Sequence, residues 1–142
     1  MHSAFLDTDV ILDLFIRREP HHGYALRLFS RLRRSSTKCV TSPVVIANVY
    51  YLLAKIRSKR YALQRMGKLR TLVEVATLDQ STVDAAVASP YRDFEDSLQY
   101  QCAIRNDIGT LITRNVRDFP KDRLMIVTPR DYLDMASEEE EG

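Results

Sequence analysis

The amino-acid sequence predicts an α/β fold with a mostly parallel sheet that helices cover on both faces. Short apolar segments typical of buried strands alternate with longer segments that carry apolar residues at helical spacing. The predicted order is one strand and two helices, three times in succession, followed by two strands and a last helix. A chain of 142 residues fits one domain and can bury one core.

In the first half of the chain, turn and cap residues separate the predicted elements. Glu19-Pro20 interrupts the helical pattern, because the residue before proline disfavours helical backbone. Ser42-Pro43 is a typical helix start, with a serine cap and proline in the first position, and Ser58 can cap the next helix. The predicted elements are strands at 3–7 and 38–41 and helices at 10–15, 21–33, 44–55 and 58–69.

In the second half, an alternating β-branched segment predicts the third strand, and two further apolar runs predict the fourth and fifth. The fourth strand begins at Gly109, after a region expected to end a helix with a glycine cap. Residues 1–136 are predicted to form the domain, and the acidic residues 137–142 a disordered tail. The predicted elements are strands at 73–77, 109–113 and 124–127 and helices at 81–88, 93–105 and 129–135.

Composition places the chain among soluble globular proteins, with 45% hydrophobic and 28% charged residues. No apolar run approaches the ~18 residues of a membrane span, and the N-terminus meets an acid too early for a secretory signal. Cys39 and Cys102 have no CxxC spacing, which favours buried free thiols in a reducing compartment. We therefore expect a cytoplasmic protein, and three scattered histidines do not suggest a zinc site.

The net charge of +2 conceals a strong asymmetry between the two halves of the chain. Residues 1–70 carry 14 Lys/Arg and 4 Asp/Glu, a net of +10, whereas residues 71–142 carry 7 and 15, a net of −8. A basic half favours a polyanionic partner such as nucleic acid. Solvated helix faces are the alternative explanation of the same pattern.

Acidic and amide side chains follow the strands or begin a helix that leads into one. Ligands of a doubly wound sheet bind beyond the carboxyl ends of its strands, at the point where the strand order reverses. In this topology the ends of the first and fourth strands can meet there. The candidate residues are Asp7, Asp93, Glu95, Asp96, Asn115 and Asp118.

Converging carboxylates repel one another and raise each other's pKa unless a cation neutralises them. A hard divalent ion with oxygen ligands is the usual solution. Mg²⁺ or Mn²⁺ can activate a bound water and neutralise charge on a phosphate. Together with a basic surface, this chemistry predicts metal-assisted hydrolysis of a phosphodiester.

Three segments in order resemble the motifs of the PIN-domain family. Phe5–Asp13 resembles the opening strand and Asp-Thr element, Asp93–Gln99 the third motif, and Thr113–Phe119 the Thr-x-Asn-x-x-Asp-Phe of the fourth. The resemblance covers the chain up to the acidic tail and is greatest to VapC-like toxins of type II toxin–antitoxin systems. It implies a three-layer α/β/α sandwich with four or five strands.

The resemblance also implies an activity and its residues: a Mg²⁺- or Mn²⁺-dependent ribonuclease, usually a homodimer, held inactive by an antitoxin that covers the catalytic groove. By position, Asp7 matches the first acidic metal ligand and Asp96 the third. Asn115 and Asp118 match the polar pair of the fourth motif, and which of them contacts metal is left open.

The second motif departs from the family pattern. The family usually has a glutamate on the helix after the second strand, and Asn48 occupies that position here. An amide can bind a metal through its oxygen but brings no charge, so metal affinity should be lower. Glu95 and Asp93 are the carboxylates that could compensate, Asp93 as a further metal ligand.

Two other functions fit parts of the sequence. Asp7-Thr8-Asp9-Val10 also fits the opening of haloacid-dehalogenase-like phosphatases, where the first aspartate is a nucleophile. The lysine and late acidic motif of that family are not found. The Asn48 departure also fits a PIN fold that binds RNA or acts as a scaffold without cleaving. Asp7 and Asp93 could in addition serve as helix caps.

Overall fold

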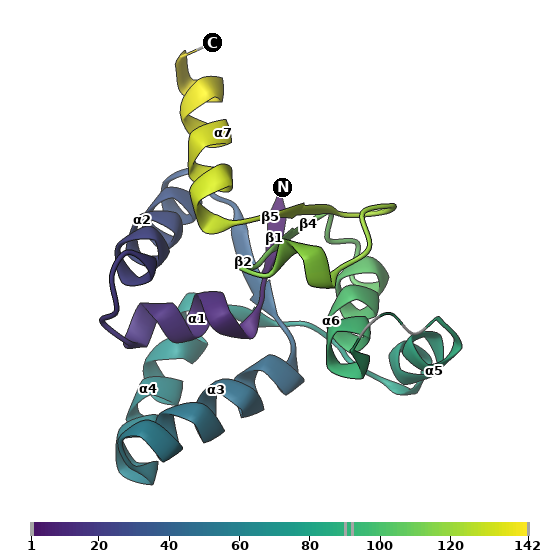
Figure 1. Cartoon of the computed structure of the whole chain (residues 1–142), viewed down its shortest axis with the longest axis horizontal. Coiled ribbons are helices and arrows are strands. Elements are labelled where there is room, and N and C mark those ends of the chain that lie inside the picture. Colours follow the sequence, from purple (N-terminus) through teal and green to yellow (C-terminus); the bar gives the residue numbers. More distant parts are fainter. Residues whose placement is uncertain (1, 90, 92, 142) are drawn as a thin grey trace.

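The computed structural model describes residues 2–89, 91 and 93–141, which form one sheet with helices on both faces (Figure 1). The sheet has the strand order β3-β2-β1-β4-β5, and all four neighbouring pairs are parallel. This confirms the predicted α/β class, and the sheet has five strands where four or five were predicted. The strands are β1 (Ser3–Leu6), β2 (Lys38–Thr41), β3 (Glu74–Val75), β4 (Thr110–Ile112) and β5 (Met125–Val127).

Helices form the two outer layers. Right-handed connections between parallel strands place α1 to α4 on one face and α5 and α6 on the other, and Figure 1 shows these groups on opposite sides of the strands. The last helix packs against α2. The helices are α1 (Thr8–Phe15), α2 (His21–Arg34), α3 (Pro43–Ile56), α4 (Lys59–Leu72), α5 (Gln80–Ala88), α6 (Phe94–Arg105) and α7 (Pro129–Glu141), with a short 3₁₀ turn η1 (Val116–Asp118).

The core lies between the central strands and the helices above and below them. Phe5, Leu6, Leu111 and Ile112 are fully buried, because β1 and β4 have a neighbouring strand on each side and a helical layer on each face. Burial of side chains of this size contributes roughly 1.5–3 kcal/mol each. The central strands therefore hold the residues that follow their carboxyl ends, Asp7 after β1 and Thr113 after β4, in fixed positions.

The predicted order of strands and helices is confirmed throughout the described residues. The predicted caps are confirmed as well: Ser42 accepts a hydrogen bond from the backbone N of Val45, and Ser58 one from that of Tyr61. The third strand is shorter than predicted, since it lies at the sheet edge and pairs only with β2. The glycine pattern suggested that Gly109 ends α6, but the residue with left-handed backbone after this helix is Asp107 (φ 58°).

The C-terminal segment differs from its prediction. Residues 137–142 were expected to be disordered because of their acidity, but α7 continues to Glu141. Glutamate is a good helix former, so a helix already fixed by its packing against α2 can extend through an acidic run. No helix within residues 2–89, 91 and 93–141 is long and apolar enough to cross a membrane.

Both cysteines are free and buried, as predicted. Burial raises the pKa of Cys39 and of Cys102 to about 11, so neither carries a reactive thiolate near neutral pH. We expect both thiols to react with a thiol reagent such as DTNB only after unfolding in guanidinium chloride. If the native protein released the coloured thionitrobenzoate anion from DTNB as fast as free cysteine does, the prediction would be wrong.

Candidate active site

Asp7 lies where the strand order of the sheet reverses, between β1 and β4. Its backbone N donates to the carbonyl of Ile112 (3.1 Å), which joins the ends of the two strands. Its carboxylate accepts from the backbone N of Thr8 (2.8 Å) and from the Thr113 hydroxyl (2.9 Å). Asp7 is thus a helix cap, as the structural alternative predicted, and also a buried carboxylate with a fixed direction.

The environment of Asp7 opposes its negative charge. Only 8% of the residue is exposed. Burial raises the pKa of Asp7, the hydrogen bonds from Thr8 and Thr113 lower it in part, and the charge of Asp118 raises it. A cation would relieve this unfavourable charge, and none of the groups that shift this pKa is basic.

The first turn of α6 brings a second group of acids toward Asp7. Asp93 caps the helix, since it accepts from the backbone N of Asp96 (3.1 Å). The pKa of Asp96 is raised to about 7. Burial is the largest cause, and the negative charges of four neighbours raise it further, in the order Asp7, Asp93, Asp118 and Glu95. Two carboxylates that are 89 positions apart in sequence therefore repel each other across one site.

Asn48 and Glu95 connect the two helical layers at this site. The Asn48 side chain on α3 donates through Nδ2 to Oε1 of Glu95 at 2.5 Å. Burial raises the pKa of Glu95, as do Asp93 and Asp7, whereas the bond from Asn48 lowers it. The Asn48 amide on α3 thus holds a carboxylate that comes from α6.

The two polar residues of the fourth motif, Asn115 and Asp118, have different surroundings. Asn115 donates through Nδ2 to Asp9 Oδ2 (3.0 Å) and through its backbone N to Thr113 Oγ1 (3.1 Å). Asp118, in the turn η1, influences the pKa of both Asp7 and Asp96. Asn115 therefore fixes the loop after β4, while Asp118 joins the carboxylates. We call Asp7, Asp93, Glu95, Asp96 and Asp118 the acidic cluster.

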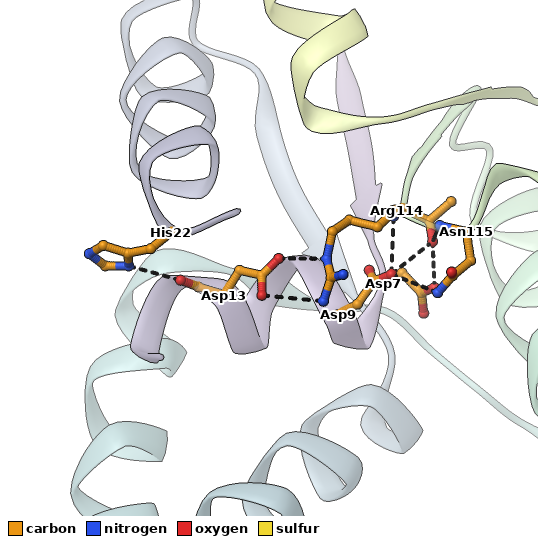
Figure 2. A network of polar contacts seen from close by, with 7 residues as sticks. Asp7, Asp9, Asp13, His22, Arg114 and Asn115 are labelled. Atoms are coloured by element: carbon orange, nitrogen blue, oxygen red, sulfur yellow. Dashed lines mark hydrogen bonds and ion pairs between the residues drawn. The ribbon is translucent and has the colours of Figure 1, made fainter. Parts of the chain in front are cut away.

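Asp9 is a further member of the site that the sequence analysis did not select. Its Oδ2 accepts from the backbone N of Arg114 and from Asn115, each at 3.0 Å, and its buried Oδ1 has no partner among the described residues (Figure 2). Burial raises the pKa of Asp9 to about 7, with Asp7 the next cause. Its position two residues after Asp7 was the available signal.

A buried ion pair borders the site, also unpredicted. Arg114 contacts Asp13 through Nε (2.8 Å) and through a terminal nitrogen (3.4 Å), and the Asp13 side chain is only 4% exposed (Figure 2). His22 Nδ1 is 2.9 Å from the Asp13 carbonyl, which ties α2 to α1. The loop after β4 is thereby anchored on α1 at two points, Asp9 and Asp13.

The acidic cluster fits a divalent cation in chemistry and charge. Its donors are hard oxygens. Burial, and then the charge of neighbouring carboxylates, raises the pKa of Asp7, Glu95 and Asp96. As they stand, the described side chains do not bring three or more His, Cys, Asp or Glu into a metal-holding arrangement.

Raised aspartate pKa values predict that the metal-free protein loses stability as pH rises. Asp9 and Asp96 have pKa values of about 7 in the folded chain, against an ordinary value of 3.8. Between these values the folded protein holds more protons than the unfolded chain, so its free energy of unfolding falls with rising pH. We expect the thermal midpoint in EDTA to fall from mildly acidic to neutral pH, and Asp96→Asn to reduce the slope. A midpoint that rises over this range would contradict the prediction.

The fold and the site define a class of protein: the profile of the PIN domain matches residues 3–117, and the chain belongs to that family. Its sequence is 27% identical over 137 residues to ribonuclease VapC1 of Aquifex aeolicus, covering 93% of this chain and 94% of the relative. Family membership and the matching fold leave no support for the haloacid-dehalogenase-like alternative.

Solved structures share the fold over most of the chain. A toxin–antitoxin complex from Klebsiella pneumoniae superposes with a TM-score of 0.68 at 23% identity, covering 89% of this chain and 97% of the other. VapC20 of Mycobacterium tuberculosis, described as a toxin that cleaves the sarcin–ricin loop, has a TM-score of 0.61 at 21% identity, with 76% and 86% covered. The three-layer α/β/α arrangement of this chain is therefore shared with these solved structures.

Proposed function

We propose that the protein is a Mg²⁺- or Mn²⁺-dependent ribonuclease that acts in the cytoplasm as the toxin of a toxin–antitoxin pair. The observation that carries the proposal is the convergence of carboxylates from three separate segments at the strand-order reversal of a PIN fold. The similarity to ribonuclease VapC1 supports RNA as the substrate.

In this proposal Asp7, Asp96 and Asp93 hold the cation, with Glu95 and Asp118 beside them. When bound, the ion would activate a water and neutralise charge on the phosphate. Thr113 and the backbone of Thr8 fix the direction of the Asp7 carboxylate. Asn115 and Asp9 hold the loop that carries Asp118, so we assign the metal-side role in the fourth motif to Asp118 and a positioning role to Asn115.

The decisive test compares cleavage of structured RNAs, including a sarcin–ricin-loop hairpin, in Mg²⁺, Mn²⁺ and EDTA. We expect wild-type protein to cleave only with metal, and Asp96→Asn to lose cleavage in every condition. RNA binding without metal-dependent cleavage would instead support the inactive RNA-binding or scaffold alternative. Activity of Asp96→Asn equal to wild type would exclude the proposed site.

The Asn48–Glu95 contact predicts that the carboxylate of the second motif has moved from α3 to α6. Glu95→Gln is expected to weaken Mn²⁺ binding about tenfold, and the exchange Asn48→Glu/Glu95→Asn to restore most of it. Calorimetric titration with Mn²⁺ measures this without relying on cleavage. Glu74→Gln, an exposed carboxylate on β3, is the matched control. Unchanged affinity in Glu95→Gln would contradict the prediction.

An antitoxin partner is supported by a groove of about 1000 Å³ beside α2 and α4. Its walls combine apolar side chains with a surplus of positive charge, which suits an amphipathic, acidic segment of a partner protein. The apolar residues are Leu14, Phe15, Leu26, Phe29 and Leu72, and the basic ones Arg17, Arg33, Arg34, Arg65 and Lys68.

The groove can be tested with the antitoxin co-expressed from a neighbouring gene. Leu26, 48% exposed, is the clearest apolar target. Leu26→Glu should weaken recovery of the complex and leave metal-dependent RNA cleavage by the free protein intact. Val87→Glu, at an exposed apolar residue of α5 outside the groove, is the control. An equally stable complex in Leu26→Glu would place the partner elsewhere.

A homodimer is supported by apolar side chains that α3 and α4 leave exposed. Tyr51 is 69% exposed, Ile56 55% and Leu63 67%. Exposed apolar side chains gathered on a helix pair favour an interaction surface. We expect light scattering to give a dimer mass for wild type and a monomer mass for Tyr51→Lys/Ile56→Lys. A monomeric wild type would refute this assembly.

A further inference from the structure

A cavity of about 370 Å³ lies beside the acidic cluster, between the N-terminal ends of α2 and α7. We call it the α2–α7 cavity; its lining includes Pro20, His21, Tyr24, Arg114, Asn115 and Arg130. Resting on the proposed ribonuclease function, we propose that this cavity binds one nucleotide of the RNA next to the scissile phosphate, with the base against His21 and Tyr24.

The cavity and the acidic cluster share one stretch of backbone. Arg114 and Asn115 line the cavity, and the same two residues donate to Asp9 from the backbone N and the side-chain Nδ2, each at 3.0 Å. Asp9 in turn is two residues from Asp7. Figure 2 shows Arg114 and Asn115 beside Asp9 and Asp7, so an RNA strand whose phosphate lies at the cluster would place a neighbouring nucleotide at this cavity.

The walls offer flat, partly apolar surfaces of the kind that bind nucleobases. Tyr24 and His21 are half-buried and belong to the first turn of α2, and Pro20 precedes them. The Arg27 guanidinium lies over the Tyr24 ring, 4.8 Å from its centroid, and lines a neighbouring hollow. Arg27 thus fixes the ring, and the ring offers a stacking surface to the cavity, as aromatic side chains do in single-strand binding.

The charges in the cavity suit the phosphate and sugar of a nucleotide. Arg114 is held by Asp13 through Nε and one terminal nitrogen, so its position is fixed while donor hydrogens remain. Arg130 is exposed in the first turn of α7. Among the described residues that line the cavity, Asp13 is the only acid, and it is already paired with Arg114. The cavity therefore has net positive character directly beside the strongly negative cluster.

Size and position distinguish this cavity from the other hollows. Its volume lies at the lower end of the ~300–1,000 Å³ range of small-molecule sites, and it is too small for a helix of a partner. The α2–α4 groove is larger, and a third cavity, lined by His2, Asp107 and Gly109, lies at the opposite ends of the strands. Unlike these two hollows, the α2–α7 cavity is lined by Arg114 and Asn115 of the site.

Nucleotide binding can be measured on the metal-free full chain without any cleavage. We expect AMP, CMP, GMP or UMP to shift the backbone NMR signals of residues 21–24, 114–115 and 130. Ribose 5-phosphate and inorganic phosphate should give much smaller shifts, because they lack the base. Equal NMR shifts with inorganic phosphate alone would show that the site binds only an anion, which would overturn the proposal. Shifts confined to residues outside the cavity would overturn it as well.

Cleavage kinetics provide the second arm. Tyr24→Ala and His21→Ala should each raise KM for RNA about tenfold with kcat less affected, and Tyr24→Phe should retain wild-type values. Val87→Ala, at an exposed residue of α5 outside the cavity, is the control. Normal KM in Tyr24→Ala would overturn the subsite while leaving the ribonuclease function intact. Absence of cleavage by wild type would refute the function, while the nucleotide titration still decides the subsite.

Discussion

Asp7→Asn is expected to abolish RNA cleavage and, at the same time, to stabilise the metal-free protein. Loss of partners outside the ligand shell already costs about 10- to 100-fold in metal affinity or activity, so loss of a ligand charge should reduce cleavage by at least ~100-fold. Stability should rise because burial and Asp118 both oppose a charge on Asp7. We expect an increase in thermal midpoint on the order of 3 °C in EDTA.

The matched control for Asp7→Asn is Asp13→Asn, which replaces another buried aspartate. Asp13 is paired with Arg114, so its neutralisation removes a favourable interaction and should lower stability. A gain of stability in Asp7→Asn and a loss in Asp13→Asn would distinguish a carboxylate without a cationic partner from one that is paired with arginine. Equal losses of stability, or cleavage retained by Asp7→Asn with Mn²⁺, would contradict our interpretation of the site.

Arg114→Ala is expected to cause the largest loss of stability among single substitutions at the site. The Asp13 carboxylate, 4% exposed, would remain buried without its partner. Removing one member of a buried ion pair costs about 3–5 kcal/mol, whereas an exposed pair contributes under about 1 kcal/mol. Denaturant unfolding followed by circular dichroism measures the difference.

Two further variants make the interpretation of Arg114→Ala specific. Lys38→Ala removes an exposed pair with Glu74, whose side chains are 47% and 64% exposed, and should have little effect. Asp13→Asn/Arg114→Ala should recover part of the loss, because the uncompensated charge is gone. A loss in the double variant equal to the sum of the two single losses would show that the ion pair is not what stabilises this loop.

The sequence was sufficient for the architecture because its signals are local. Apolar runs and caps such as Ser42 and Ser58 depend on neighbouring residues alone, and the strand ends of a parallel sheet share one edge. That reasoning correctly brought the candidate acids to one edge. It is also why the order of elements could be predicted without knowing which side chains meet.

The contacts inside the site could not be predicted in the same way. Arg114 with Asp13, and Asn48 with Glu95, join positions that are 101 and 47 residues apart. No periodicity tells which side chain of one helix faces which of another, and the role of Asp9 depends on a loop that folds back from β4. The last helix extends beyond its predicted end near residue 135 for a different reason: its length depends on helix propensity and on the packing of α7 against α2.

The hydrogen bond between Asp7 and Thr113 spans 106 positions of the chain. During synthesis the first aspartate leaves the ribosome long before its partner strand exists, so a nascent chain cannot assemble the proposed catalytic centre until β4 and η1 have emerged. On the proposed function, a chain that stops before Asp118 would therefore lack the assembled site and could not cleave RNA.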